Sequence, residues 1–389
     1  MPFSYKIVLL MIAGLALAVP QAVLSQDTLA DEMSTTERLS RSAWWPTKFS
    51  GSSDKYVGNA ACAECHAGIT KAQQESEMGR TLMPVAESKL ASYAGKQVSV
   101  DGFLYQFLST PQGLAFTLPA IKNSAPKPLT WAFGSGAISQ VYITPEQSSF
   151  NESHFSYFAG IDGFDVTPAQ PTLRTGKMEP QGIDTIKKEI GRTVPMQEAR
   201  RCFVCHAANV PAEGPLAEIV PGVSCEACHG PGGHHVVAMR AGLPQGGALI
   251  MNPSHLRPVD QVDFCGSCHG TSIDVQLGGS IGLPSVRFPA YRLQNSACWS
   301  NDTRIQCTGC HDPHKSLLHD AASYDARCLA CHASSVAAKT DAEHPGRACP
   351  TGTKDCARCH MPKYEFPDVH HKFTDHQIRV VKPGEHIPA

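Results

Sequence analysis

The feature that most constrains this chain is a five-residue pattern, Cys-x-x-Cys-His, which occurs seven times and uses fourteen of the sixteen cysteines. Residues i, i+3 and i+4 lie on one face of a helical turn, so each copy presents two sulfurs and an imidazole together. This is the spacing of a c-type haem attachment site. It predicts seven covalently attached haem c groups, each with its iron. The predicted thioether cysteines are Cys62, Cys65, Cys202, Cys205, Cys225, Cys228, Cys265, Cys268, Cys307, Cys310, Cys328, Cys331, Cys356 and Cys359, and the predicted proximal iron ligands are His66, His206, His229, His269, His311, His332 and His360.

Two other interpretations of the cysteine pairs fit less well. Zinc ribbons also use Cys-x-x-Cys, but they need two pairs per metal and no histidine directly after each pair. A disulfide framework joins well-separated cysteines of suitable geometry, and seven tight pairs would link almost nothing.

The N-terminus has the pattern of an export signal. Lys6 precedes an apolar run from Ile7 to Val19, which is followed by Pro20 and small residues up to Ser25. This order is typical of a secretory signal peptide over residues 1–25. The run is short for a membrane span, although an uncleaved anchor is the alternative. The predicted location is periplasmic or extracellular, where haem is attached to such motifs.

Charge limits the classes of partner. The formal net charge is −2, and no basic patch suggests a nucleic acid. Haem propionates would make the loaded protein more acidic. The expected partners are other redox proteins or cytochromes, and electrostatic steering favours a basic one. Membrane association would come only through partners or an uncleaved signal.

The motifs are distributed unevenly. Six lie between Cys202 and His360, and their first cysteines are 23, 40, 42, 21 and 28 residues apart, too irregular for a repeat solenoid. The first motif stands 140 residues before the second. We expect a fold that is mostly α and irregular, organised around packed haems, with a small β element in the N-terminal region. The expected divisions are a polar lead-in at 26–55, a mono-haem region at 56–200, a hexahaem region at 201–377 and a tail at 378–389.

The β element is predicted between the first two motifs. Apolar residues alternate in places over 97–107, which indicates a strand. The segment Thr110-Pro-Gln-Gly113 is a turn signal, and 114–118 could return as the partner strand. Further strands are expected within 131–143 and 154–158.

Eleven histidines lie outside the motifs, and seven irons need at most one more ligand each. Several of these histidines follow closely after a motif, which favours bis-histidine ligation and low-spin iron suited to electron transfer. The eleven are His154, His234, His235, His255, His314, His319, His344, His370, His371, His376 and His386.

Three segments resemble the cytochrome c-554-like multihaem family, relatives of the hydroxylamine-oxidoreductase and pentahaem nitrite-reductase scaffolds. The segment C-E-A-C-H-G-P-G-G-H-H is similar to a family pattern in which a later histidine ligates a neighbouring haem; this implies His235, with His234 as the alternative. The segment C-T-G-C-H-D-P-H implies His314. The stretch after C-A-R-C-H-M-P-K implies His371 and His376.

The likeness covers most of 56–377 and is weaker around S-H-F-S-Y-F, which contains His154. His154 and His255 complete the histidine candidates for the distal position. Family members often have a histidine shortly after the first motif, where this chain has Met78, with Met83 nearby. A methionine ligand raises the haem potential. Met78 is therefore a candidate distal ligand, and the alternative is a methionine that packs against porphyrin.

Two cysteines, Cys298 and Cys349, remain outside the motifs. Because unpaired thiols are a liability in an exported protein, we expect a disulfide between them. The family likeness includes cysteines at these positions. The alternative is two free buried thiols.

Two function classes compete. The first is an electron carrier that moves electrons between redox partners through mainly bis-histidine haems. The second is a multihaem oxidoreductase with one open haem, acting on a small nitrogen or sulfur compound such as hydroxylamine or nitrite. Family enzymes often mark the open haem with lysine in place of the motif histidine, and all seven motifs here are unaltered. The sequence therefore favours a carrier without substrate chemistry of its own.

Overall fold

The computed structural model describes residues 55–122, 124–170, 190–211, 214–216, 219–278, 280–296, 298–299, 305–333, 349–350, 352–382, 384–385 and 387. The expected signal peptide and nearly all of the polar lead-in lie outside these residues. Within the described ranges, no helix has the length and apolar character needed to cross a membrane.

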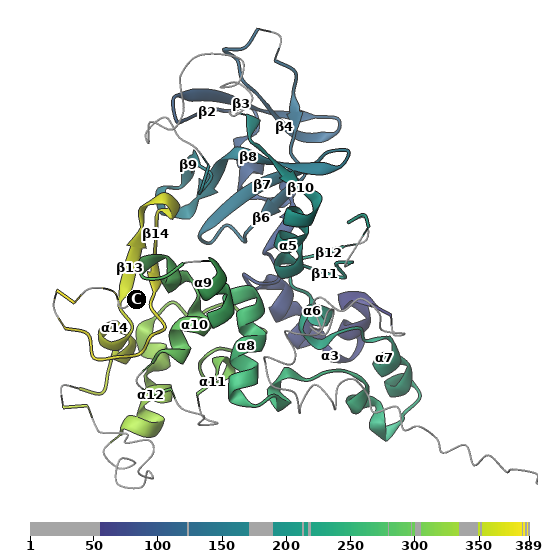
Figure 1. The fold of residues 1–389 in the computed structure, drawn as a ribbon. Helices are drawn as coiled ribbons and strands as arrows, with labels where there is room; N and C mark the ends of the chain where they lie inside the picture. The colour runs from purple at the N-terminus through teal and green to yellow at the C-terminus, as the bar shows by residue number, and fades with distance from the viewer. Residues whose placement is uncertain are drawn as a thin grey trace, which may run out of the picture.

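The strands of the N-terminal part form two antiparallel sheets, seen at the top of Figure 1. The larger has the order β1-β6-β7-β8-β10, with β9 on β8, and the smaller has the order β2-β3-β4-β5. The strands are β1 (Leu82–Pro84), β2 (Gln97–Val100), β3 (Phe103–Thr110), β4 (Gly113–Thr117), β5 (Lys127–Pro128), β6 (Trp131–Phe133), β7 (Ser139–Pro145), β8 (Ser149–Phe158), β9 (Gly163–Val166) and β10 (Arg192–Pro195).

An aromatic core joins the two sheets. The Phe155 ring on β8 lies 4.8 Å from Tyr105 and 5.2 Å from Phe107, measured between ring centroids. Tyr105 and Phe107 alternate with less buried neighbours on β3, as expected of a strand with one face in the core. This part of the chain therefore has the apolar core of an ordinary β protein.

The expected β element differs from the observed one in two ways. It is larger than predicted, because short strands such as β1 and β10 have no alternation that a sequence pattern could reveal. The strand expected over 97–107 is two strands, since the chain turns at Asp101 and Gly102, which have φ values of 50° and 86°. The hairpin expected around 110–113 is confirmed, with Thr110 opposite Gly113.

Short helices make up most of the lower part of Figure 1. They are α3 (Gly58–Glu75), α5 (Met196–His206), α6 (Cys225–His229), α7 (Gly233–Arg240), α8 (Pro258–His269), α9 (Ser272–Gly278), α10 (Pro289–Gln294), α11 (Cys307–Cys310), α12 (Asp325–His332) and α14 (Cys356–His360). Two small hairpins accompany them, β11 (Ala207–Ala208) with β12 (Val220–Pro221) and β13 (Lys363–Phe366) with β14 (His371–Thr374).

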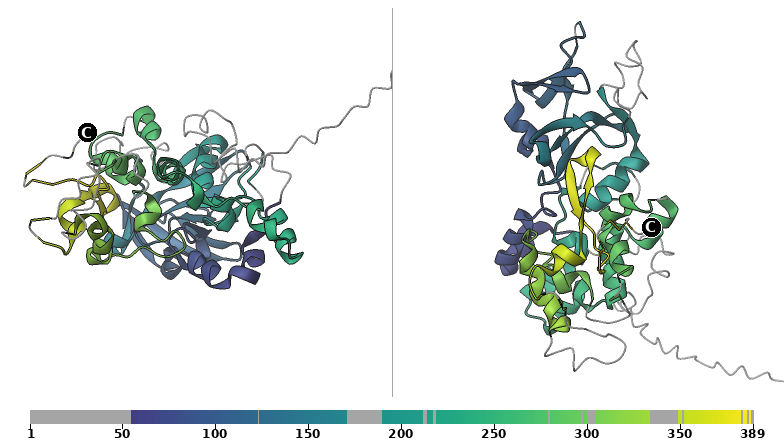
Figure 2. Two further views of the ribbon diagram at one scale, coloured as in Figure 1. Left: turned by 90° about the horizontal axis from the view of Figure 1, so that it is seen from below. Right: turned by 90° about the vertical axis from the view of Figure 1, so that its left-hand side faces the viewer.

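The C-terminal hairpin connects the two parts of the molecule. Figure 2 shows β13 and β14 reaching the N-terminal sheet, where His370 Nε2 lies 2.8 Å from Asp165 Oδ2 on β9. At Gly160, a Cβ atom would lie only 2.0 Å from the His370 carbonyl oxygen. Only glycine fits this close backbone approach.

Beyond the hairpin, a buried ion pair anchors the chain to α10. Asp375 accepts from Arg292 Nε at 2.8 Å and Nη2 at 2.9 Å, and both side chains are fully buried. Arg379 Nη1 adds a bond of 2.7 Å. Burial raises the pKa of Asp375, but the hydrogen bonds from Arg292 and Arg379 outweigh it and hold that pKa below its usual value.

This arrangement predicts a large loss of stability on Asp375→Ala. The change leaves the Arg292 guanidinium buried without its counter-charge, which costs about 3–5 kcal/mol of unfolding free energy. Urea unfolding of the haem-loaded protein, followed by far-ultraviolet circular dichroism, measures the loss. Glu64→Ala is the control, because Glu64 forms an exposed pair with Arg240 and should change the midpoint little. Equal midpoints for Asp375→Ala and the wild type would contradict the prediction.

Candidate functional site

All seven motifs lie on helical turns, as their spacing predicted. In chain order they are carried by α3, α5, α6, α8, α11, α12 and α14, and five of these helices end at the motif histidine. α11 ends one residue earlier, at Cys310, and α3 runs past His66, where φ and ψ of −116° and 37° interrupt the helix. Each motif can therefore present its sulfurs and imidazole on one side.

Backbone carbonyls orient several motif histidines. His229 Nδ1 lies 2.8 Å from the Met251 oxygen, and His360 Nδ1 lies 2.9 Å from the Arg379 oxygen. His206 Nδ1 lies 3.0 Å from the carbonyl oxygen of Thr81. A histidine that donates from Nδ1 to a carbonyl keeps Nε2 for a metal, which is the usual outer-sphere arrangement of a ligand.

Two histidines from outside the motifs face motif histidines. The ring centroids of His229 and His314 are 6.2 Å apart with nearly parallel planes, at 6°. Those of His311 and His376 are 6.3 Å apart, with an angle of 45°. Two metal–imidazole bonds of ~2 Å in line would place ring centres about 6 Å apart. Each pair is thus spaced to hold one iron between its rings.

His314 and His376 also have an oxygen close to Nδ1, as the motif histidines do. His314 Nδ1 lies 3.5 Å from Asp312 Oδ1, and His376 Nδ1 lies 3.1 Å from the Thr374 carbonyl oxygen. Burial lowers the pKa of His376 to about 4, with a smaller contribution from the charge of His311. The ring is therefore neutral near pH 7, the form that binds a metal.

The remaining distal candidates occupy different surroundings. His235 on α7 resembles the ligands above, since its Nδ1 lies 2.7 Å from the Gly246 oxygen. His371 lies against the Phe373 ring at 4.8 Å, and His255 is exposed in a turn. Met78 lies in the turn after α3, where its carbonyl accepts from Val223 N at 3.1 Å. The neighbouring Met83 is buried in the β core.

His154 belongs to the β core. It is 1% exposed on β8, with Nδ1 3.2 Å from Gln170 Oε1 and Nε2 3.8 Å from Asp101 Oδ2. Burial lowers its pKa, so the ring is neutral. The structure thus places His154 in the β core, and its role as a distal ligand stays a prediction.

The expected bridge between Cys298 and Cys349 is not formed, because Cys298 has a free thiol. Burial raises the pKa of this thiol, and the nearby charges that affect it come from Cys328, Cys310 and Cys331. Cys298 therefore lies beside the fifth and sixth motifs.

The surroundings of the motifs suit a flat apolar group. Apart from Ala199 and Phe203 of α5, which pack into a cluster with the larger sheet, the described motif helices share one buried apolar cluster, Met251, Leu256 and Phe264, packed against Cys228 and Cys265. Large apolar side chains instead lie exposed shortly after motifs; Leu277, for example, is 85% exposed. The others of this kind are Ile69, Val237, Met239, Leu243, Leu249, Ile273, Ile281, Leu317 and Leu318. Porphyrin faces would cover such side chains, so these residues fit haem.

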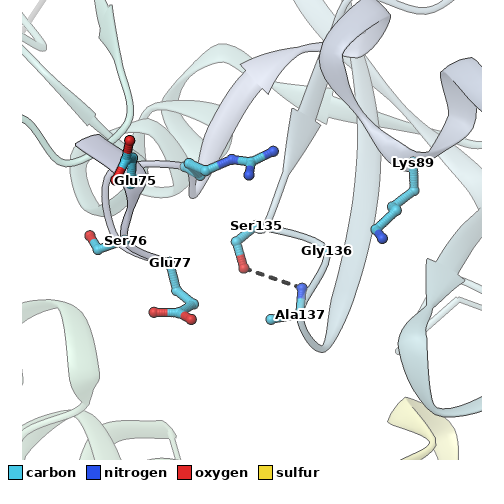
Figure 3. A pocket seen from close by; sticks show the side chains of 8 residues that line it. Glu75, Ser76, Glu77, Lys89, Ser135, Gly136 and Ala137 are labelled. Carbon is cyan, nitrogen blue, oxygen red and sulfur yellow. Dashed lines mark hydrogen bonds between the residues drawn. The ribbon is translucent and has the colours of Figure 1, made fainter. Parts of the chain in front are cut away.

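One depression of about 260 Å³ lies away from the motifs (Figure 3). It is formed by the end of α3, the loop before β7, Arg80 and Lys89. Its lining has carboxylates and cations but no cysteine or histidine. It is therefore separate from the haem-binding residues.

One family model matches a part of this chain that carries two motifs. Residues 168–230 match the family model described as cytochrome c554 and c-prime, and this range contains the second and third motifs. No curated protein matches the sequence. A solved structure, the crystal structure of outer cell wall cytochrome OcwA, is 14% identical with a TM-score of 0.49, over 84% of this chain and 80% of that chain.

The facing histidines lead to a spectroscopic prediction. His314→Ala and His376→Ala should each leave one iron with a single imidazole, so each variant should gain one high-spin haem that binds carbon monoxide. Electron paramagnetic resonance of the oxidised protein and carbon monoxide titration of the reduced protein measure this. The control is His319→Ala, which removes an exposed histidine that is not among the candidate ligands and should leave both readouts unchanged. Wild-type spectra for both variants would rule out the two pairs as ligands.

The motifs on helical turns and the match over 168–230 make this chain similar to the cytochrome c554 and c-prime family.

Proposed function

We propose that the chain is an exported cytochrome that binds seven haem c groups and passes electrons between redox proteins without a chemical substrate. The observation that carries the proposal is that a histidine from outside the motifs faces the motif histidine at both the third and the fifth motif. When bound, haem supplies one-electron chemistry at iron. Imidazoles on both sides leave no open position for a substrate, which favours electron transfer over catalysis.

The chain's own residues hold the cofactor in this proposal. The fourteen motif cysteines bind it covalently, and the seven motif histidines are the proximal ligands. His314 faces His229 and His376 faces His311, so these are the proposed distal ligands of the third and fifth haems. His235, His371, His255, His154 and Met78 remain the candidates for other haems.

Backbone carbonyl groups and burial prepare the motif histidines to bind iron. The Nδ1 bonds of His229 and His360 to backbone oxygens hold each ring in one orientation. Burial lowers the pKa of His269 and of His206, which keeps both rings neutral near pH 7. Neutral, fixed imidazoles reduce the rearrangement that accompanies a change of iron charge.

Location and partners are part of the proposal. The charged and apolar pattern of residues 1–25 supports export to the periplasm or beyond. Seven motifs without a substituted histidine support a carrier, whose partners would be other redox proteins or cytochromes.

The deciding test of the carrier function uses the wild-type protein loaded with haem. Mass spectrometry should find seven haems per chain. Electron paramagnetic resonance should show only low-spin iron, and the reduced protein should not bind carbon monoxide. A high-spin haem that binds carbon monoxide would contradict the carrier function. Hydroxylamine and nitrite would then be the first substrates to test.

A separate prediction concerns Met78. If Met78 ligates the first haem or a close neighbour, the oxidised protein has a sulfur-to-iron charge-transfer band at the red end of its spectrum. Met78→Ala should abolish this band and lower one haem potential, because methionine ligation raises the potential. Met83→Leu is the control, since Met83 is buried in the β core. A band that survives Met78→Ala would exclude this ligand.

A further inference from the structure

The motif helices pack against one another in three pairs. α3 packs on α6, α8 on α11 and α12 on α14, as Figure 1 shows. These contacts bring together the first and third, fourth and fifth, and sixth and seventh motifs. Elements far apart in the sequence form the first pair, so chain order alone does not create the pairing.

The same device holds each pair together: a buried side-chain oxygen from one motif helix accepts from backbone N–H groups at the start of its partner. In the first pair, Glu226 Oε1 and Oε2 accept from Val57 N at 2.9 Å and Gly58 N at 2.8 Å. Asn59 on α3 accepts from Cys225 N at 3.2 Å in return. Each helix thus caps the other.

The third pair has the same arrangement. Asp325 on α12 accepts from Asp355 N and from Cys356 N, both at 2.8 Å. Cys356 is the first cysteine of the seventh motif. A carboxylate here also interacts favourably with the positive end of α14.

An amide takes this position in the second pair. Gln261 Oε1 on α8 accepts from Thr308 N at 3.3 Å and from Thr308 Oγ1 at 2.8 Å. Thr308 directly follows the first cysteine of the fifth motif. Glu226, Gln261 and Asp325 are 2%, 1% and 9% exposed, so water does not compete strongly for these bonds.

The pairing brings sulfurs from different motifs together. Cys62 lies near Cys225, Cys265 near Cys307, and Cys328 near Cys356. Six of the seven motifs are involved. In the haem-loaded protein these sulfurs would be thioethers, which lie on the same paired helices.

Further contacts join the pairs into one series. The cluster of Met251, Leu256 and Phe264 packs against both Cys228 and Cys265, which connects the third motif to the fourth. The His311 ring lies 5.5 Å from that of Tyr324, directly before α12, which connects the fifth to the sixth. Cys205 Sγ lies 3.8 Å from the Ser267 oxygen, so the second motif lies beside the fourth.

We propose that Glu226, Gln261 and Asp325 are positioning residues that hold the attachment sites in three close pairs and thereby set the coupling between the haems of each pair. The inference rests on the proposed electron-transfer function and deepens it. The contacts between motifs place them in the spatial order first, third, fourth, fifth, sixth and seventh, and the second motif lies beside the fourth.

The test compares Glu226 with a second glutamate inside a motif. Glu64 also lies between the two cysteines of a motif, one position later than Glu226 does in its motif, but it is 54% exposed and pairs with Arg240. Glu64→Gln is therefore the matched control for Glu226→Gln. Both changes remove one charge within a Cys-x-x-Cys-His motif.

The readout is circular dichroism in the Soret band of the full-length, haem-loaded protein. Haems held close together split each other's absorption and give a two-signed signal. Glu226→Ala should lose roughly a third of this amplitude, since one of three separate pairs is disturbed. Glu226→Gln should lose less, because the amide keeps one accepting oxygen. Glu64→Gln should match the wild type.

Asp325 supplies an independent test that does not change a residue inside a motif. Asp325→Ala should lower the amplitude of the two-signed Soret signal. In the double variant with Glu226→Gln the two losses should add, because the two pairs of motifs are separate. Haem content by mass spectrometry accompanies each variant. Asp325→Asn, which keeps one accepting oxygen, should recover part of the signal.

A full two-signed signal in Asp325→Ala and Glu226→Gln, with seven haems per chain, would overturn the proposal. If Glu226→Ala attaches fewer than seven haems, its signal does not test the proposal, and the Soret signals of the Asp325 variants and of Glu226→Gln test it instead. The carrier function fails separately, through a high-spin haem in the wild type. A wild type with only low-spin haems and a signal that none of these variants changes would overturn the positioning role alone.

Discussion

The hydrogen bonds between motif helices are the interaction on which the haem-bearing part depends. α6, α11 and α14 have five, four and five residues. Helices this short are not stable alone, because nucleation is unfavourable and most of their N–H groups lack a partner within the helix. Oxygens from Asn59, Gln261 and Asp325 satisfy such groups at the starts of these helices. The bonds that stabilise each short helix therefore also determine which motif lies beside it.

The two parts of the molecule achieve stability by different means. Around Phe155, aromatic rings from both sheets form a core that needs no cofactor. Beyond the cluster that α5 shares with the larger sheet, the described motif helices have a buried cluster of three apolar residues, and side chains such as Leu277 are exposed. Apolar surface left in water costs roughly 25 cal/mol per Å². In the proposed haem-loaded protein, porphyrins would cover much of this surface and would take the place of a protein core in this part.

The C-terminal segment links these two parts. His370 bonds to Asp165 on the N-terminal sheet, and Asp375 is buried against Arg292 on α10. His376 lies between these anchors and the fifth motif, with its ring 6.3 Å from His311. The buried ion pair therefore also positions a proposed ligand, since Asp375 directly precedes His376. Its partners come from distant parts of the chain, which no local pattern could reveal.

The sequence by itself determined the cofactor chemistry, because the attachment of haem c needs only two cysteines and a histidine on one helical turn. It also indicated the hairpin of β3 and β4, whose alternation and turn are local. Only the tertiary structure decided that His314 faces His229, that His154 belongs to the β core and that Cys298 has a free thiol. The pairing of the first motif with the third, through Glu226, is likewise a tertiary feature. The physical reason is the same throughout: spacing along the chain sets which groups share a turn, whereas the partner of each turn depends on contacts between residues distant in sequence.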